Sequence, residues 1–347
     1  MKKISLAIAI LLSMGAKTFA QNANNPNNQQ VQYHFFTNNI PTDWNYPLVG
    51  LVNNVNGNHA SVQIGLINST TGNFGGLQAG FINSVGGDVL GVQSGFINSV
   101  NGELKGVQNG FINSVNDNFI GIQNGFINSV DKSFYGVQTG FINSTNDKFY
   151  GVQCGFINSA GQIHGLQYGF INSAKSLRGV QFGFINSVDK LEKGLPIGFL
   201  SFVKHGGYKA IEVSNNNIIP LNIAFKTGVR KLYTYPMLAY DWRLTDDRLS
   251  FGCGVGSNLD LSNRLFINPE LEGLHQVSLD FNHYSTLRCN LGFNISENFE
   301  LVAGPSLVWQ FKIDADDFHQ NYTEWDPSIV SVNQVSLGWN VALRYKF

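Results

Sequence analysis

The densest cluster of side chains that could carry chemistry lies near the C-terminus of the chain. It combines carboxylates with one imidazole: Asp314, Asp316, Asp317, His319, Glu324 and Asp326. Carboxylate oxygens at this density could bind Ca²⁺, and an Asp/His pair could act as general acid and base in a hydrolase on the rim of a barrel. A solvated outer loop has the same composition, and we favour that interpretation.

Other signatures of catalysis or cofactor binding are absent from the sequence. It contains no Gly-x-Ser-x-Gly, His-Glu-x-x-His or Walker A motif, and its histidines lack metal-ligand spacing. Residues 252–256 (GCGVG) superficially resemble a dinucleotide-binding loop, but they lie in an alternating strand pattern without a following helix. We therefore predict a protein without enzymatic activity and without catalytic, cofactor-binding or metal-binding residues.

Cysteine chemistry is also sparse. Cys154, Cys253 and Cys289 are odd in number and show no Cys-x-x-Cys spacing, so neither a disulfide framework nor a metal-thiolate site is indicated. We interpret all three as small hydrophobic residues. A disulfide between Cys253 and Cys289 is the alternative.

The composition narrows the class of protein. Of 347 residues, 22 are Lys or Arg and 23 are Asp or Glu, which gives a net charge of -1 and only 13% charged residues. Nucleic-acid binding requires a basic surface, so we expect no nucleic-acid partner. With 43% hydrophobic residues and 38 glycines, the chain has the profile of an outer-membrane β-barrel or a β-solenoid.

The N-terminus has the features of an export signal. Lys2 and Lys3 precede a short apolar run over residues 4–12, and small residues end the segment at Ala20. This pattern predicts a cleaved signal peptide over residues 1–20. The Asn- and Gln-rich sequence that follows predicts a disordered leader with a possible first strand over residues 21–45. No other segment is long and apolar enough to cross a membrane as a helix, so we expect any membrane span to be a β-barrel.

A 15-residue repeat fills residues 46–207. Each full unit follows the pattern of residues 106–115, GVQNGFINSV, and a short polar turn completes it. Two glycines in each unit disfavour a helix and indicate strands. Full units begin at Gly76, Gly91, Gly106, Gly121, Gly136, Gly151, Gly165 and Gly179, and degenerate units begin at Tyr46, Ser61 and Gly194.

The repeat is compatible with two architectures. Its first ten positions carry no charge in any unit, which is the length and character of a strand that crosses a bilayer. In such a barrel, alternation would place Val92, Phe96 and Asn98 on the lipid face and Gln93 on the lumen face, so every unit would expose an Asn to lipid at some cost. In a parallel β-solenoid, the same Asn would stack from coil to coil as a hydrogen-bonded ladder.

The C-terminal part favours the membrane barrel. Over residues 208–347, apolar and polar residues alternate with period two, as in residues 287–295 and 335–347. The last residue, Phe347, closes a strand with an aromatic ring, which resembles the terminal signature of bacterial outer-membrane barrels and implies insertion by the barrel-assembly machinery. Aromatic residues near strand ends suit interfacial girdles: Tyr233, Tyr235, Tyr240, Trp242, Trp339 and Tyr345.

The alternation also predicts what lines the lumen. Five basic residues fall on the inferred lumen faces: Lys226, Arg230, Arg288, Arg344 and Lys346. In an open barrel they could favour anionic solutes, whereas Glu270 and Glu300 on the same faces oppose such a preference. A polar lumen can also bury a few charges without any function.

The repeat resembles a bacterial surface-repeat family with tandem Gly-[Val/Leu]-Gln-x-Gly-[Phe/Leu]-[Ile/Val]-Asn units behind a signal peptide. Residues 106–113 are a representative match, and residues 194–203 and 207–213 resemble the passage of that family into its C-terminal strands. The resemblance implies a location in the envelope or at the cell surface. It brings no established activity, so it assigns no functional residue.

We therefore predict an all-β outer-membrane protein with one large antiparallel barrel in which the repeats are consecutive strands. The alternative is a β-solenoid of about eleven coils followed by a smaller barrel. The expected function is a structural or surface-interaction role at the cell surface, with outer-membrane lipid and the barrel-assembly machinery as partners. A porin-like passive channel for small solutes and a rim-loop hydrolase are the alternative functions.

Overall fold

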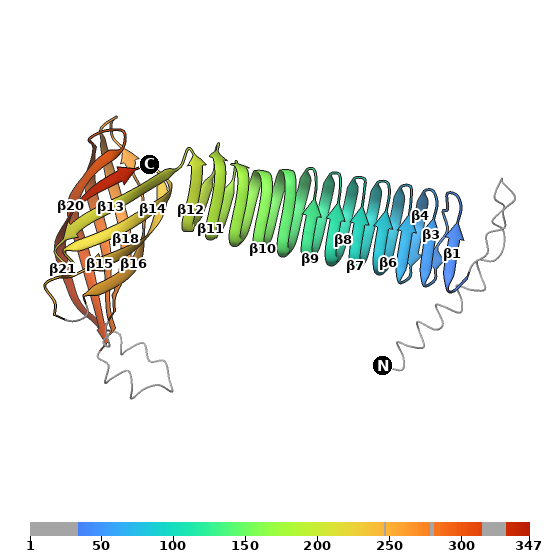
Figure 1. The fold of residues 1–347 in the computed structure, drawn as a ribbon, viewed down its shortest axis with the longest axis horizontal. Coiled ribbons are helices and arrows are strands. Elements are labelled where there is room, and N and C mark those ends of the chain that lie inside the picture. Colours follow the sequence, from blue (N-terminus) through green and yellow to red (C-terminus); the bar gives the residue numbers. More distant parts are fainter. Residues whose placement is uncertain (1–33, 246–247, 278–280, 314–330) are drawn as a thin grey trace. The chain divides into compact units, whose positions relative to one another are not determined.

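The computed structural model describes residues 34–245, 248–277, 281–313 and 331–347, and these residues contain strands and no helix. The predicted signal peptide and residues 21–33 of the predicted leader lie outside this part of the chain. The chain divides into two compact units, residues 1–170 and 171–347. Both contain coils of a parallel β-solenoid of about eleven turns, and the second also contains a closed antiparallel barrel of eight strands (Figure 1).

The repeats pair in parallel, each with the equivalent residues of the next unit. Gly91 pairs with Gly106 and Asn98 with Asn113, one repeat apart. The solenoid strands are β1 (Thr37–Ile40), β2 (Leu48–Val49), β3 (Val52–Val55), β4 (His59–Ile64), β5 (Ile67–Thr70), β6 (Phe74–Val85), β7 (Val89–Val100), β8 (Leu104–Val115), β9 (Phe119–Val130), β10 (Phe134–Leu177), β11 (Val180–Leu191) and β12 (Leu195–His205). The prediction that the repeats are antiparallel strands of one large barrel is therefore wrong, and the solenoid alternative is confirmed.

A bend in each repeat explains why simple alternation assigned its faces incorrectly. The pairing of neighbouring coils is interrupted at Phe96, where the chain turns from one straight segment to the next. Beyond the bend the inward positions change parity, so Gln93 and Asn98 are both buried. A single straight strand would place Val92, Phe96 and Asn98 on one face. In the structure Val92 and Phe96 lie on the outside, whereas Asn98 points into the coil.

Two ladders of buried amides satisfy the polar groups inside the coils. The Asn98 side-chain amide donates to Asn113 Oδ1 at 2.8 Å and to the carbonyl oxygen of Asn109 at 2.9 Å. In the second ladder, Gln108 Nε2 donates to Gln93 Oε1 at 2.9 Å. A buried polar group without a hydrogen-bond partner destabilises a fold. Here each buried amide finds its partner in the equivalent amide of the next coil, so the polar groups inside the solenoid are satisfied.

The barrel closes through pairing of its first and last strands. Its eight main strands are β13 (Tyr208–Asn216), β14 (Leu221–Val229), β15 (Leu232–Tyr240), β16 (Leu249–Gly256), β18 (Leu265–Gln276), β19 (Phe281–Asn294), β20 (Phe299–Ile313) and β21 (Ser331–Lys346), and the short β17 (Leu259–Asp260) pairs with β18. β13 pairs with both β14 and β21, and β16 pairs with β18. The ladder is therefore continuous around the barrel.

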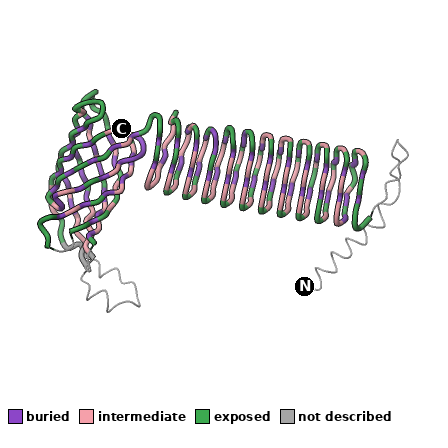
Figure 2. The backbone as a smooth tube through the Cα atoms, viewed as in Figure 1, coloured by how far each residue is buried: buried purple, intermediate pink, exposed green. Residues whose placement is uncertain are grey.

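The barrel has polar residues inside and apolar residues outside. On β19, Arg288 and Asn290 are buried, whereas Leu287 and Leu291 are 45% and 56% exposed. Figure 2 shows this alternation of buried and exposed residues along the barrel strands. Tyr233 and Tyr235, which we expected in an interfacial girdle, lie instead inside the barrel with about 1% exposure. Glycines on the neighbouring strand make room for their rings, because a Cβ at Gly254 or Gly256 would overlap them.

Candidate functional site

A cluster of charged side chains fills the interior of the barrel. Lys226 forms ion pairs with Glu212, at 2.9 Å, and with Glu270. Arg344 Nη2 lies 2.9 Å from Glu270 Oε1, and its Nε donates to Glu212. All four side chains are at most 2% exposed. An unpaired charge in such an interior is strongly unfavourable, so each of these side chains needs its oppositely charged neighbours in order to remain buried in its charged form.

Further pairs extend this cluster along the barrel axis. Arg288 donates to Glu272, and Tyr235 Oη donates to the same carboxylate at 3.2 Å. Toward one end of the barrel, Glu300 accepts hydrogen bonds from Tyr208 Oη at 3.1 Å and from Arg230 Nη1 at 2.7 Å. These contacts come from strands on different sides of the barrel, so they tie its walls together.

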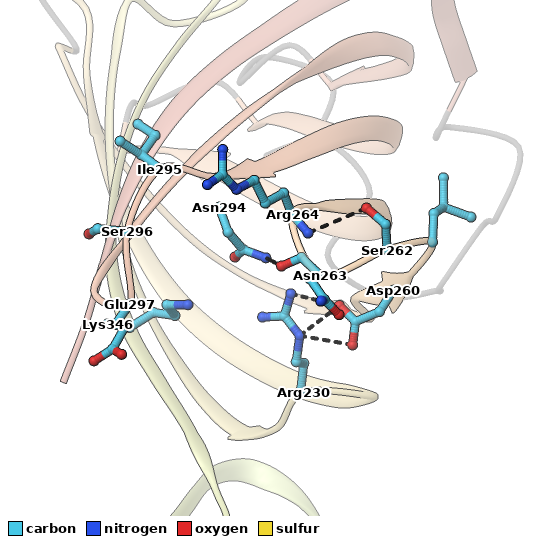
Figure 3. Close-up of a pocket in the computed structure, with 11 residues that line it drawn as sticks. Arg230, Asp260, Ser262, Asn263, Arg264, Asn294, Ile295, Ser296, Glu297 and Lys346 are labelled. Atoms are coloured by element: carbon cyan, nitrogen blue, oxygen red, sulfur yellow. Dashed lines mark hydrogen bonds and ion pairs between the residues drawn. The ribbon is translucent and has the colours of Figure 1, made fainter.

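A cavity of about 800 Å³ lies at the end of the barrel where Arg230 and Lys346 are located. It is lined by the β14–β15 turn, the β17–β18 turn, the β19–β20 turn and the end of β21, as the close-up shows (Figure 3). Asp260 Oδ1 accepts hydrogen bonds from Arg230 Nε at 3.0 Å and Nη2 at 2.8 Å. Lys346 Nζ lies 3.1 Å from Glu300 Oε1. The basic side chains of Arg230 and Lys346 at this end of the barrel, the barrel mouth, are thus already paired with carboxylates of the protein.

A second candidate surface is a column of aromatic rings on the outside of the coils. The phenylalanines at the bend of each repeat stack on one another, with ring centroids 4.9 Å apart from Phe96 to Phe111 and from Phe111 to Phe126. These rings remain 42–43% exposed despite the stacking. The result is a regular exposed column of aromatic rings, which is the kind of surface that contacts other molecules.

Some charged residues of the solenoid form ion pairs between neighbouring coils. Lys132 Nζ lies 2.8 Å from Asp117 Oδ2 across neighbouring turns, and this hydrogen bond lowers the pKa of the Asp117 carboxyl. Arg178 similarly lowers the pKa of Glu192. Because these pairs are exposed to solvent, they contribute little to stability.

The cluster of carboxylates and one imidazole near the C-terminus lies outside the described residues: Asp314, Asp316, Asp317, His319, Glu324 and Asp326. Elsewhere, in the part of the chain that the structure describes, no group of His, Cys, Asp and Glu side chains could hold a metal ion. Cys154, Cys253 and Cys289 are all free, so the alternative of a Cys253–Cys289 disulfide is wrong. Cys253 and Cys289 lie exposed on the outer face of the barrel.

The structure brings the predicted lumen residues together as neighbours in one network. Lys226, Arg288, Arg344, Glu270 and Glu300 are all buried within the barrel, whereas Arg230 and Lys346 lie at its mouth. Glu212 and Glu272 were not among the predicted lumen residues, although Glu212 lies between the outward-facing Ile211 and Val213 and Glu272 follows the outward-facing Leu271. The mouth residues Asp260 and Arg264 lie in the two-residue strand β17 and in the turn that follows it, which are too short to carry an alternation that would identify them.

We compared the chain with models of protein families, with curated proteins and with solved structures, and no match was found in any of the three comparisons. Among the described residues there is no helix that is long and apolar enough to cross a membrane.

Proposed function

We propose that this chain is a non-enzymatic outer-membrane repeat protein. In this proposal the eight-stranded barrel anchors the chain in outer-membrane lipid, and the solenoid is a structural or interaction module. The predicted signal peptide would direct export, and the barrel-assembly machinery would insert the barrel.

The observation that carries the proposal is the inverted distribution of polarity in the barrel. A barrel in water buries apolar residues, whereas this one buries Arg288, Arg344 and Glu270 and exposes leucine, valine and aromatic side chains around its wall. The outward residues of β21 show this most clearly, because Leu337 is 83% exposed and Trp339 is 49% exposed. Lipid is the environment that this surface suits.

The apolar wall ends where the last solenoid coil covers the barrel. Thr227 Oγ1 on β14 accepts a hydrogen bond from the backbone N–H of Ser201 on β12, at 3.1 Å. Thr234 on β15 donates to the carbonyl oxygens of Gly198 and Phe199. These polar contacts mark one rim of the barrel as a protein contact, so the lipid-facing band begins beyond them.

A matched pair of lysine substitutions tests the proposal. Leu287 faces outward on β19 between Leu271 and Leu307 of the neighbouring strands. In lipid, Leu287→Lys is expected to destabilise the barrel by about 2–4 kcal/mol near the bilayer midplane. Leu90→Lys is the control, because Leu90 is 69% exposed on a coil and the next coil has Lys105 at the same position.

The readout is the amount of folded protein recovered in washed outer membranes. We expect a strong loss for Leu287→Lys and wild-type recovery for Leu90→Lys. Wild-type recovery of both variants would contradict the proposal, because a wall that faces water tolerates lysine.

A further inference from the structure

The two ends of the barrel differ in the chain that connects their strands. At one end, residues 230–231 join β14 to β15 and residues 295–298 join β19 to β20. At the same end, β17 folds back onto β18 within the β16–β18 connection. At the opposite end, residues 217–220, 241–248 and 277–280 join successive strands, and the longest interval between two barrel strands, residues 314–330, separates β20 from β21.

The lengths of the strands show the same asymmetry. β13, β14 and β15 have 9 residues each, whereas β19, β20 and β21 have 14, 15 and 16. At the end with the short turns, the start of β13, the start of β20 and the end of β21 lie beside one another, because Ala210 pairs with Lys346 and Glu300 pairs with Arg344. The additional residues of β19–β21 therefore extend the wall at the other end, where β20 and β21 remain paired as far as Lys312 and Ser331.

The solenoid joins the barrel at the end with the short turns. β12 ends at His205 and β13 begins at Tyr208, directly beside the end of β21. The buried ion pairs of Lys226, Arg288 and Arg344 fill the interior, so the chain before Tyr208 does not pass through the barrel. The repeats must therefore stay on the side of the membrane where the short turns lie.

From these observations we infer that the repeat solenoid is a periplasmic module and that the opposite end of the barrel, where β20 ends and β21 begins, faces the cell exterior. The inference rests on the proposed function, because it requires that the barrel lies in the outer membrane. Outer-membrane barrels have short turns on the periplasmic side and longer loops outside. The partners of the uncharged aromatic column are then periplasmic molecules, whereas the sequence-based expectation was a role at the cell surface.

Single cysteines on the two sides test this orientation. The background chain carries Cys154→Ser, Cys253→Ala and Cys289→Ala, and the serine matches Ser94 at the same repeat position. Three variants then add one exposed cysteine each: Thr245→Cys between β15 and β16, Glu297→Cys in the turn between β19 and β20, and Lys148→Cys at an exposed position of β10 in the solenoid. A fourth variant keeps only the native Cys289, which lies on the outer wall of the barrel.

Whole cells are labelled with a membrane-impermeant maleimide before and after the outer membrane is permeabilised. We expect Thr245→Cys to react in intact cells, and Glu297→Cys and Lys148→Cys to react only after permeabilisation. Labelling of Glu297→Cys and Lys148→Cys in intact cells, with Thr245→Cys protected, would overturn the inferred orientation.

The Cys289 variant distinguishes a wrong orientation of the barrel from a barrel that does not lie in the membrane at all. If lipid surrounds the barrel, Cys289 stays unlabelled under both conditions until detergent is added, whichever way the barrel points. Labelling of Cys289 without detergent would mean that the wall faces water, and both the anchor and the orientation would be withdrawn.

Discussion

In seven of the eight full repeats, those that begin at Gly76 to Gly165, the first glycine has a backbone conformation that other residues rarely adopt. Gly121 has φ 138°, and a Cβ there would overlap the carbonyl oxygen of Gly106 in the preceding coil. Glycine is therefore required both by the backbone angle and by the close approach of two coils. The recurrence of glycine at this position has a structural cause and needs no functional one.

We expect Gly121→Ala to destabilise the solenoid by about 1–3 kcal/mol, the usual cost of a strained backbone residue. Gly75→Ala is the control, since its Cβ would meet only Ala60 atoms at ordinary contact distances and its φ is not positive. Thermal unfolding followed by circular dichroism measures both variants. Equal melting temperatures for the two would show that the tight approach can relax without cost.

His59 is a buried titratable residue in a column that is otherwise mostly apolar. The equivalent positions of the following coils are Phe74, Val89 and Leu104, and the imidazole stacks on Phe74 with ring centroids 5.5 Å apart. Burial lowers the pKa of His59 from 6.5 to about 4. Between these two values the unfolded chain binds a proton that the folded chain does not.

The N-terminal coils should therefore lose stability as the pH falls from 6.5 to 4, by at most about 3 kcal/mol. The loss is complete near pH 4, and the stability is fully present above pH 6.5. His59→Phe should remove this dependence and continue the Phe74 stack. Amide hydrogen exchange of β4 at pH 7 and pH 5 measures the effect, and an unchanged pH dependence in His59→Phe would refute it.

At the scale of the element, the Asn ladder holds neighbouring coils in register. Asn113 accepts from Asn98 at 2.8 Å and donates to Asn128 Oδ1 and to the carbonyl oxygen of Asn124. Asn113→Ala would leave buried groups on both sides without a partner, so we expect a loss of about 1–3 kcal/mol.

Ser114→Ala is the matched control for the Asn113 prediction, because Ser114 is the adjacent residue and faces outward. Chemical denaturation of the purified chain in detergent compares the two variants with the wild type. A loss for Ser114→Ala as large as that for Asn113→Ala would argue against the ladder as the source of stability.

The same elements show which parts of the fold could be predicted from sequence. Period-two alternation gave the correct faces for residues 287–293, because a straight strand in a closed barrel keeps one parity along its length. It failed for the repeats, because the bend at Phe96 changes the parity within one unit. Alternation gave Lys226 and Glu270 the same face but could not show that they form an ion pair, because pairing depends on register across strands.

A spacing of fifteen residues does not by itself distinguish parallel coils from an antiparallel meander. The buried Asn of each unit carried the decisive information, because lipid offers an amide no partner whereas an identical coil does. The glycine that begins each full repeat also favours parallel coils, because in a stack of coils it contacts the equivalent glycine of the preceding coil. At the barrel mouth, Asp260 and Arg264 could not be predicted, because a two-residue strand and a turn lack any periodic signal.

At the scale of the whole molecule, the charged interior bears on the porin-like alternative. Lys226, Arg288 and Arg344 are at most 2% exposed and are paired with carboxylates across the barrel. We therefore expect no steady ion conductance when the purified chain is reconstituted into planar lipid bilayers. Protein-free detergent is the control, and reproducible single-channel steps would instead support a passive channel.

The constant parallel register has a consequence for how such a chain can change over time. Every coil presents the same edge to its neighbour, so adding or deleting one repeat leaves the remaining pairings intact. Each coil adds about 4.8 Å along the stack. In-frame recombination among near-identical fifteen-residue repeats could therefore lengthen or shorten the solenoid in steps of forty-five nucleotides, without any change to the barrel.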